Sequence, residues 1–405
     1  MTTTGGPLKG VRVLDISTQI SGPMATQMMA DQGAAVIKVE APPAGDGMRH
    51  LGPVRGGMSA GFHMFNRGKR SVVLDLKTAA GKEVLHKLIA QTDVLVQNFR
   101  PKVMQRLGLD YETIRQSYPE LIYVSISGFG EQGPLADRPS FDHIMQCYTG
   151  LAAAQAGPNR DGEPALIRNV LIDKVTAMTA AQAATAALFA RSQGAGGQEI
   201  KISMLGVTIA FLWPDAAGPH QLLGDDVEMR PSLADRARLF PFKNGTGTFN
   251  GSDASFAALC RDLNAPTGND PRLRTAAGRA RHKEMMAEVE REWAQATAQM
   301  DVDEGFAIIE ATGAPCAKVR DLDDLIDDEQ VAANGYLRVV DHPQAGPIRE
   351  PRPAAEFSAM PLDLPAAAPT LGQQTEEILA ELGFDAEARN RLREHGALGQ
   401  SHAKG

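Results

Sequence analysis

The stretch "VRVLDISTQISGPMATQMMADQGAAVIKV", residues 11–39, decides the fold because a strand, a helix and a second strand follow one another in it. Residues 11–16 and 34–39 are short, apolar and rich in β-branched side chains, as buried strands are. Between them a helical pattern opens with Pro23 and stops at Gly33, which suit those two helix positions. This unit predicts two parallel strands joined by a crossover helix.

The same alternation continues to about residue 130. The stretch 78–91 has a helical apolar face, formed by Val84, Leu85, Leu88 and Ile89. Further buried strands are expected at 71–76, 94–99 and 121–127. We therefore predict an α/β fold with a Rossmann-like parallel sheet, helices on both faces, and ligands beyond the carboxyl ends of the strands.

The second half of the chain changes in character. An Ala-rich helix over 174–192 and a strand entering a helix over 198–205 complete the first domain. A polar, turn-rich stretch then leads to amphipathic helices near 252–264, 278–299 and 303–311, and from Asp341 the chain is Pro-rich. We predict three parts: a large α/β domain over 1–214, a small α+β domain over 215–330, and a Pro-rich strap with a C-terminal helix over 331–405 that returns to the large domain.

The composition of the 405 residues is that of an ordinary globular protein, with 43% hydrophobic and 22% charged residues. The net charge of −8 argues against nucleic acid or an anionic membrane as a partner. No apolar run approaches the ~18 residues of a membrane span, and "MTTTGGPLKG" does not resemble a signal peptide. Three cysteines without metal-ligand spacing fit a reducing cytosol. We expect a cytoplasmic protein without a metal site.

One acid opens the small, apolar helix in "NVLIDKVTAMTAAQAATAALFA", residues 169–190. Asp173 has two interpretations. A carboxylate near a helix N-terminus satisfies free N–H groups and suits the helix dipole. Alternatively, the carboxylate faces a substrate. The local sequence leaves both open.

Two other motifs have competing interpretations. "GFGEQG" (128–133) matches a dinucleotide-binding pattern, but Pro134 and a loop follow where that site needs a helix. We therefore expect no nicotinamide or flavin there. "NRGKRS" (66–71) is either a solvated basic turn or a phosphate-binding sheet edge. No G-x-S-x-G elbow is present, which argues against a serine hydrolase.

Several segments together resemble one family, the class III coenzyme A transferases, of the CaiB/BaiF type. The family includes formyl-CoA transferase and the carnitine and bile-acid CoA transferases. The matching segments are "LKGVRVLDISTQISGPMATQMMADQGAAVIKVEAPPAGDGMR" (8–49), "FNRGKRSVVLDLKTAAGKEVLHKLIAQTDVLVQNFRPKVMQRLGLDYETI" (65–114), "PELIYVSISGFGEQGP" (119–134) and "APTLGQQTEEILAELG" (368–383). The resemblance covers most of the chain except about 215–300.

The resemblance implies a role for particular residues. Asp173 matches the family's covalent nucleophile, which attacks an acyl-CoA thioester and forms a mixed anhydride and then an enzyme–CoA thioester. The glycine loop 127–133 is a candidate source of oxyanion donors. Lys77 and Arg106 are expected to meet phosphates and Phe99 the adenine. The implied CoA-binding residues are Leu74, Lys77, Asn98, Phe99 and Arg106.

The resemblance also implies the partners. We expect an interlocked homodimer that acts on an acyl-CoA and a small carboxylic acid, with coenzyme A as a substrate carrier and no tightly bound cofactor. Ile20 and Ala41 stand where the formyl-CoA branch has glutamine and arginine, and "NGTGTFNG" (244–251) only loosely echoes that branch's glycine-rich loop. These departures argue against formyl and oxalyl substrates and leave a dicarboxylate such as succinate as a hypothesis.

Two other functions compete. The superfamily also contains 2-methylacyl-CoA racemases, which use a His and an Asp to move a proton. In "SFDH" (140–143), Phe141 occupies the place expected for that base and His143 lies two residues on. The sequence thus favours the transferase. A non-catalytic CoA-binding scaffold would require Asp173 to be a simple helix cap.

Overall fold

The computed structural model describes residues 5–156, 162–228, 230 and 237–399. Within these ranges the chain forms two compact units. The first contains residues 5–155, 164–211 and 334–399, and the second lies mainly within 212–333. The first unit therefore combines the N-terminal half of the chain with its C-terminal end.

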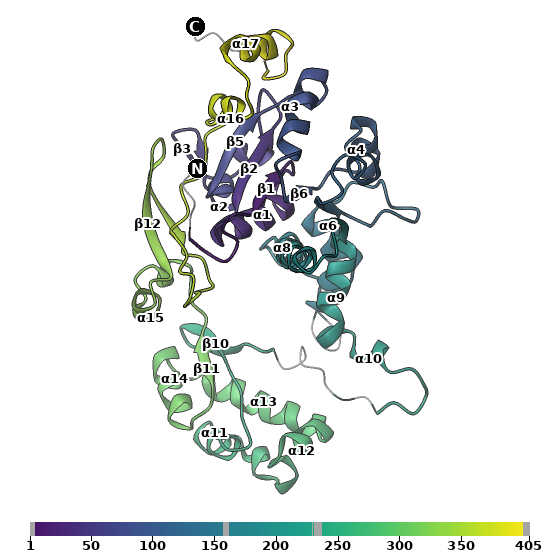
Figure 1. The fold of residues 1–405 in the computed structure, drawn as a ribbon. Helices are drawn as coiled ribbons and strands as arrows, with labels where there is room; N and C mark the ends of the chain where they lie inside the picture. Colours follow the sequence, from purple (N-terminus) through teal and green to yellow (C-terminus); the bar gives the residue numbers. More distant parts are fainter. Residues whose placement is uncertain (1–4, 157–161, 229, 231–236, 400–405) are drawn as a thin grey trace. The chain divides into compact units, whose positions relative to one another are not determined.

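A six-stranded sheet lies at the centre of the first unit, in the order β5-β2-β1-β6-β7-β8 (Figure 1). Its strands are β1 (Arg12–Asp15), β2 (Ala35–Glu40), β5 (Lys69–Val73), β6 (Val94–Gln97), β7 (Ile122–Ser127) and β8 (Gln198–Ser203). Every pairing is parallel, and Val13 of β1 lies between Val36 of β2 and Val94 of β6. The predicted parallel sheet is confirmed.

Helices cover both faces of this sheet. On one face, α1 (Ser21–Asp31) packs against α8 (Leu171–Ser192). The α8 face toward the core is built from buried alanines, among them Ala177, Ala180 and Ala184, whose small side chains allow close approach. The opposite face is covered by α3 (Ala79–Ile89), α4 (Pro101–Leu107), α5 (Tyr111–Ile114), α16 (Thr375–Glu381) and α17 (Ala386–Glu394).

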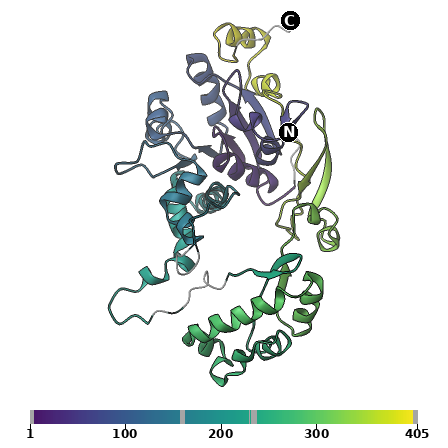
Figure 2. The ribbon, with the colours of Figure 1, turned by 180° about the vertical axis from the view of Figure 1, so that it is seen from behind.

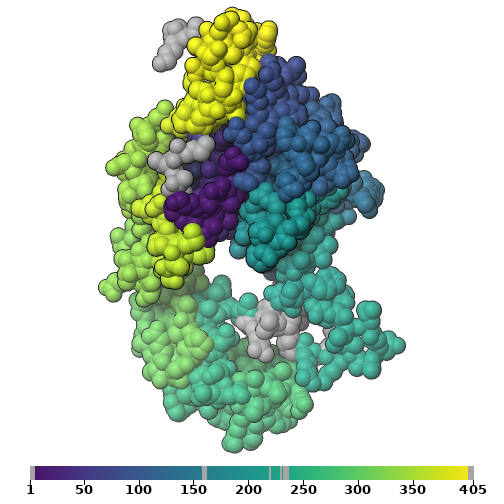
Figure 3. All heavy atoms as spheres, viewed as in Figure 1, coloured from purple at the N-terminus to yellow at the C-terminus, as the bar shows by residue number. Residues whose placement is uncertain are grey.

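The C-terminal segment packs on the β5 edge of the sheet. Ser71 accepts a hydrogen bond from the Gln374 N–H (3.0 Å), and the Asp75 N–H donates to the carbonyl of Ala397 (2.7 Å). Figure 3 shows this yellow segment against the blue segment that contains α3. The C-terminal end of the chain thus lies against the edge of the sheet.

The stretch expected to be only an extended strap contains a hairpin. Strands β12 (Leu337–His342) and β13 (Gly346–Pro351) pair antiparallel from Leu337–Pro351 to His342–Gly346, and Figure 2 shows the hairpin from behind. The expectation was wrong because prolines at 343, 347 and 351 read as breakers. Prolines are tolerated at strand ends and on edge strands.

The second unit has its own core. Three antiparallel strands, in the order β11-β10-β9, pack with helices around Phe240, Phe249, Phe256 and Trp293. Its strands are β9 (Phe240–Phe242), β10 (Gly245–Phe249) and β11 (Cys316–Lys318), and its main helices are α11 (Phe256–Asp262), α12 (Ala276–Arg281), α13 (Lys283–Thr297) and α14 (Val302–Ala311). Part of the turn-rich stretch expected after residue 214, namely 229 and 231–236, lies outside the described residues.

The remaining elements are short, apart from one apolar helix, α9. They are β3 (Val54–Arg55), β4 (Met58–Ser59), α2 (Ala60–Asn66), α6 (Asp142–Tyr148), α7 (Leu151–Ala154), α9 (Met204–Ala216), α10 (Gly218–Gln221) and α15 (Glu329–Ala333). Among the helices of the described residues, none combines the length and apolar character needed to cross a membrane.

Candidate functional site

The order of the strands defines where the sheet opens. The chain runs outward from β1 through β2 to β5, and then returns to the other side of β1 to form β6. The loops that follow β1 and β6 therefore diverge, which is where parallel sheets bind ligands. Asn98 joins the two loops, since its side chain accepts from the Thr18 N–H (2.9 Å) and donates to the Thr18 carbonyl (2.7 Å).

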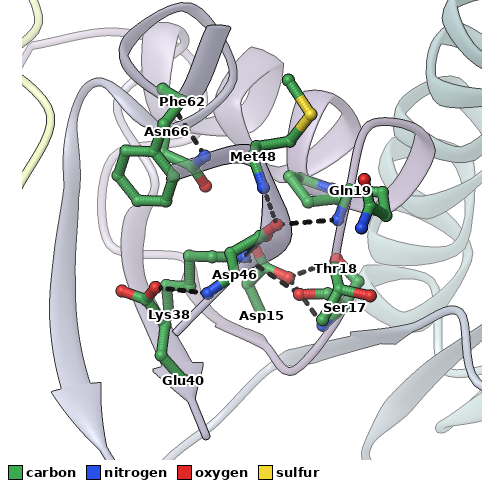
Figure 4. A network of polar contacts seen from close by, with 12 residues as sticks. Asp15, Ser17, Thr18, Gln19, Lys38, Glu40, Asp46, Met48, Phe62 and Asn66 are labelled. Carbon is green, nitrogen blue, oxygen red and sulfur yellow. Dashed lines mark hydrogen bonds and ion pairs between the residues drawn. The ribbon is translucent and has the colours of Figure 1, made fainter. Parts of the chain in front are cut away.

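The loop after β1 rests on a buried ion network (Figure 4). The Lys38 ammonium pairs with Asp46 (2.9 Å) and donates to the Ser17 carbonyl (2.9 Å). Lys69 pairs with Asp15 (2.8 Å), which also accepts from the Ser17 hydroxyl (2.5 Å). These ionic side chains are almost completely excluded from solvent.

The network also fixes an unusual backbone conformation. Gln19 has a φ of 67°, a left-handed value that is uncommon outside glycine. Its N–H donates to Asp46 Oδ1 (3.1 Å), and the same oxygen accepts from the Met48 N–H (3.0 Å). The loop thus reaches α1 in a conformation that buried charges hold in place.

Opposite charges dominate the protonation of this network. Burial alone would raise the pKa of Asp15, but the charges of Lys38 and Lys69 and the hydrogen bonds it accepts hold that pKa well below its usual range. Burial and the nearby charge of Lys38 lower the pKa of Lys69 to about 8. Asp15 therefore stays ionised, and its negative charge is compensated.

Asp173 lies in the first turn of α8 beside the start of α1. The Ser21 hydroxyl, on the first residue of α1, hydrogen-bonds to the half-buried Asp173 carboxylate. Asp142 Oδ2 accepts from the Ile172 N–H (2.6 Å) and the Asp173 N–H (3.1 Å), and the Leu171 N–H donates to the Asn169 carbonyl (2.6 Å). The free N–H groups of α8 are thus satisfied without the Asp173 side chain, which removes the helix-cap interpretation.

The environment of Asp173 differs from that of Asp15. Burial and the negative charge of Asp142 raise the pKa of Asp173 to about 6, although the hydrogen bond from Ser21 acts in the opposite direction. No Lys, Arg or His of the described residues forms an ion pair with it. An uncompensated carboxylate at a sheet's ligand-binding edge is a functional-site candidate.

The other predicted site residues lie on three loops or helices at this end of the sheet. Leu74 is completely buried, and its N–H donates to the Glu40 carbonyl (2.9 Å). Asn98 is engaged with Thr18, as described above. Lys77 and Arg106 are exposed, and neither forms an ion pair with another described residue.

Phe99 lines a cavity of about 240 Å³ beside β6 and β7, whereas the other four predicted CoA-binding residues do not. The cavity is bounded by Gln97, Phe99, Pro101, Met104, Gln105, Asp110, Tyr111, Glu112, Tyr123, Ser125, Ile126, Ser127, Glu131, Glu199 and Lys201. Four carboxylates and one ammonium line it, so this cavity is unsuited to phosphates.

The basic turn 66–71 fits neither interpretation offered by its sequence. Arg67 is buried and pairs with Asp31 (2.8 Å), Lys69 belongs to the network around Asp15, and Arg70 pairs with Glu381 (2.9 Å). The cations hold elements of the fold together. After "GFGEQG", residues 134–141 form a turn and extended chain, so the expected absence of a helix is confirmed.

Two residues of the site were missed by sequence reasoning. Asp142 lies between Phe141 and His143, which were weighed against a racemase base, and an acid in the first turn of α6 looks like an ordinary helix-start residue. Ser21 also looks like part of a helix start. Only the packing of α1 and α6 against the start of α8 brings both to Asp173.

Known proteins resemble this chain along most of its length. Residues 8–375 match the model of CoA-transferase family III. Succinyl-CoA:glutarate CoA-transferase of Mus musculus is 32% identical, and the match covers 98% of this chain and 92% of the relative. Formyl-CoA:oxalate CoA-transferase of Escherichia coli is 31% identical, and the match covers 98% of this chain and 99% of the relative. The crystal structure of a CAIB/BAIF family protein from Brucella suis superposes on this chain with a TM-score of 0.77 and 29% sequence identity. The superposition covers 93% of this chain and 100% of that chain.

Proposed function

The chain belongs to CoA-transferase family III, and we propose that it moves coenzyme A from an acyl-CoA to a carboxylic acid through covalent intermediates on Asp173. The observation that carries the proposal is the state of this carboxylate. It is half-buried, is not needed as a helix cap and has a raised pKa. Further support is the resemblance of the surrounding sequence, which matches Asp173 with the family's nucleophile.

The steps balance without an added proton or cofactor. The Asp173 carboxylate attacks the thioester carbonyl of the donor and expels CoA thiolate, which leaves an aspartyl–acyl mixed anhydride. The thiolate attacks the aspartyl carbonyl, releases the donor's carboxylate and forms an aspartyl–CoA thioester. The acceptor carboxylate and then the released thiolate repeat the two steps in reverse, so that acceptor-CoA leaves and Asp173 is free again.

Incubation with succinyl-CoA tests the nucleophile directly. We expect an adduct on the peptide that contains Asp173, detected by mass spectrometry, and exchange of CoA with added acid. Asp173→Ala should abolish both. The matched control is Asp303→Ala, because Asp303 also lies in the first turn of a helix but is 73% exposed and pairs with Lys318. Wild-type exchange rates in Asp173→Ala would refute the assignment.

For the acceptor we propose a dicarboxylate such as succinate or glutarate. The support is the similarity to transferases that bear those names and the replacement of the formyl-branch residues by Ile20 and Ala41. Succinyl-CoA tested against formate, oxalate, glutarate and acetate should give the highest kcat/KM with glutarate. Faster exchange with formate or oxalate would contradict this part.

For the coenzyme we propose that Lys77 and Arg106 bind phosphates and that Phe99 contacts the adenine. The support is that both cations are exposed and free of ion pairs with described residues. Arg106→Ala should raise the KM for acyl-CoA about tenfold with little change in kcat, as expected for lost ground-state binding. Lys102→Ala, on the same helix but paired with Asp137, is the control.

An interlocked homodimer remains a proposal, as does the division of the chain at 214 and 330. The support is the apolar surface of two helices of the described residues: Met178 and Phe189 of α8 and Ile209 and Phe211 of α9 are each more than 40% exposed. Sedimentation should give twice the chain mass. A monomer that transfers CoA would refute the dimer.

A further inference from the structure

Asp142 is a buried acid without a cationic partner among the described residues. It is 5% exposed, and both of its oxygens accept hydrogen bonds from uncharged donors. Oδ2 accepts from the N–H groups of Ile172 and Asp173, and Oδ1 accepts from Gln146 Nε2 (2.5 Å). Burying an unpaired charge is costly, and an asparagine oxygen could accept the same backbone bonds. The negative charge itself therefore requires a reason.

The position of Asp142 fixes the backbone from which Asp173 projects. One oxygen holds the N–H of Asp173 itself (3.1 Å) together with that of the preceding residue (2.6 Å). Gln146 extends this support, because its side chain also accepts from the Ile167 N–H (2.9 Å) and donates to the Ile167 carbonyl (3.0 Å). Helix α6 thus anchors both the segment that leads into α8 and its first turn.

We propose that Asp142 is a positioning residue for the transfer reaction proposed above, on which this inference rests. It occupies the N–H groups at the start of α8, so that the Asp173 carboxylate is left free, and its charge repels the ionised form of Asp173. Attack on a thioester converts that carboxylate into an uncharged anhydride. The repulsion is present before attack and relieved after it, so it favours acylation.

Few groups act on the carboxyl of Asp173. Burial has the largest effect on its pKa, followed by the charge of Asp142 from α6, and both raise it, while the Ser21 hydroxyl from α1 lowers it. On the same helix, the neighbouring Lys174 ammonium is engaged with the Asn169 side chain. Replacing Asp142 by an uncharged residue should therefore lower the pKa of Asp173.

Two pairs of variants separate the charge of Asp142 from its hydrogen bonds. Asp142→Asn keeps an acceptor for the α8 N–H groups but turns an amide toward the Gln146 amide. Gln146→Ala removes that conflict, so the sharper comparison is Gln146→Ala with and without Asp142→Asn. Both members lack the Gln146 contacts, and they differ only in the charge at position 142.

The measurement is the rate of Asp173 acylation by succinyl-CoA in a single turnover, followed between pH 4.5 and 8. The added Asp142→Asn should slow acylation about tenfold at pH 7.5. The acid limb, which is the part of the rate–pH profile where the rate falls with falling pH, should move to lower pH. Gln146→Ala alone should slow acylation but leave the acid limb in place. A structural role alone would change melting temperatures without moving that limb.

The outcomes distinguish two failures. If wild-type protein is acylated on Asp173 and Asp142→Asn leaves both the rate and the acid limb unchanged in the Gln146→Ala background, the role of Asp142 is refuted and the transfer chemistry stands. If wild-type protein exchanges CoA without acylation of Asp173, both proposals are refuted.

Discussion

One buried and one half-buried aspartate of the first unit, Asp15 and Asp173, have opposite environments. Asp15, at the end of β1, lies within hydrogen-bonding distance of Lys69 and near a second ammonium, and its pKa is held well below the usual range. Asp173, at the start of α8, has a carboxylate for a neighbour, and its pKa is raised to about 6. Burial alone would raise both, so the surrounding charges decide the difference.

The contrast separates a structural charge, that of Asp15, from the proposed nucleophile, Asp173. The stabilised Asp15 is a poor nucleophile that holds the loop after β1 in place. The destabilised Asp173 is more basic than an ordinary aspartate, and in the proposed reaction it would lose its charge on acylation. Ser21 connects the two regions, because it follows the loop that the network supports and hydrogen-bonds to Asp173. The network therefore supports a partner of the reactive group.

The largest expected effect is that of removing the Asp15 carboxylate. Asp15→Ala leaves Lys69 buried without its carboxylate, and breaking a buried pair in this way costs about 3–5 kcal/mol. Urea unfolding at pH 7.5 should show this loss in the free energy of unfolding. Asp303→Ala, at an exposed ion pair, should change that free energy by less than about 1 kcal/mol. Equal effects of the two substitutions would contradict a structural role for Asp15.

Replacing Asp173 should change the free energy of unfolding in the opposite direction. Because its folded-state pKa is raised, the native protein holds a proton between about pH 4 and pH 6 that the unfolded chain has lost. Stability therefore falls as pH rises through this window. Asp173→Asn should raise the free energy of unfolding by up to roughly 3 kcal/mol at pH 7.5 and by little at pH 4. A destabilised variant at pH 7.5 would show that the carboxylate stabilises the fold.

The same pKa predicts the pH dependence of activity. The proposed nucleophile must be ionised to attack, so kcat/KM for succinyl-CoA should fall about tenfold per pH unit below pH 6 and level off above it. Asp15, whose pKa is far lower, should not contribute in this range. Steady-state rates between pH 4.5 and 8 provide the measurement. An acid limb near pH 4 would indicate an ordinary, solvated carboxylate.

The smallest expected effect is that of replacing Ser21, which connects the region around Asp15 with Asp173. Ser21→Ala removes the hydrogen bond that lowers the pKa of Asp173, so the acid limb should move to higher pH. One hydrogen bond is worth about 0.5–1.5 kcal/mol, so below pH 6, where Asp173 is more completely protonated in the variant, kcat/KM should fall roughly two- to tenfold. Ser21→Thr should restore part of the activity because it keeps the hydroxyl. A shift of the limb to lower pH would contradict the bond.

The sequence by itself determined the sheet, the crossover helices and the candidate nucleophile. Strands such as 94–97 and the apolar face of α3 are local patterns, and the motifs around them place Asp173 by position along the chain. Such features depend on residues that are neighbours in sequence.

The tertiary structure alone decided how the charges are paired. The sequence presents Arg67, Lys69 and Arg70 as one basic turn, yet each bonds to a different element. Likewise, Asp142 and Ser21 lie 31 and 152 residues from Asp173 along the chain, and nothing in their local sequences marks them. Coulomb interactions and hydrogen bonds depend on distance in space, so the state of a buried acid follows from packing between segments that the sequence keeps apart.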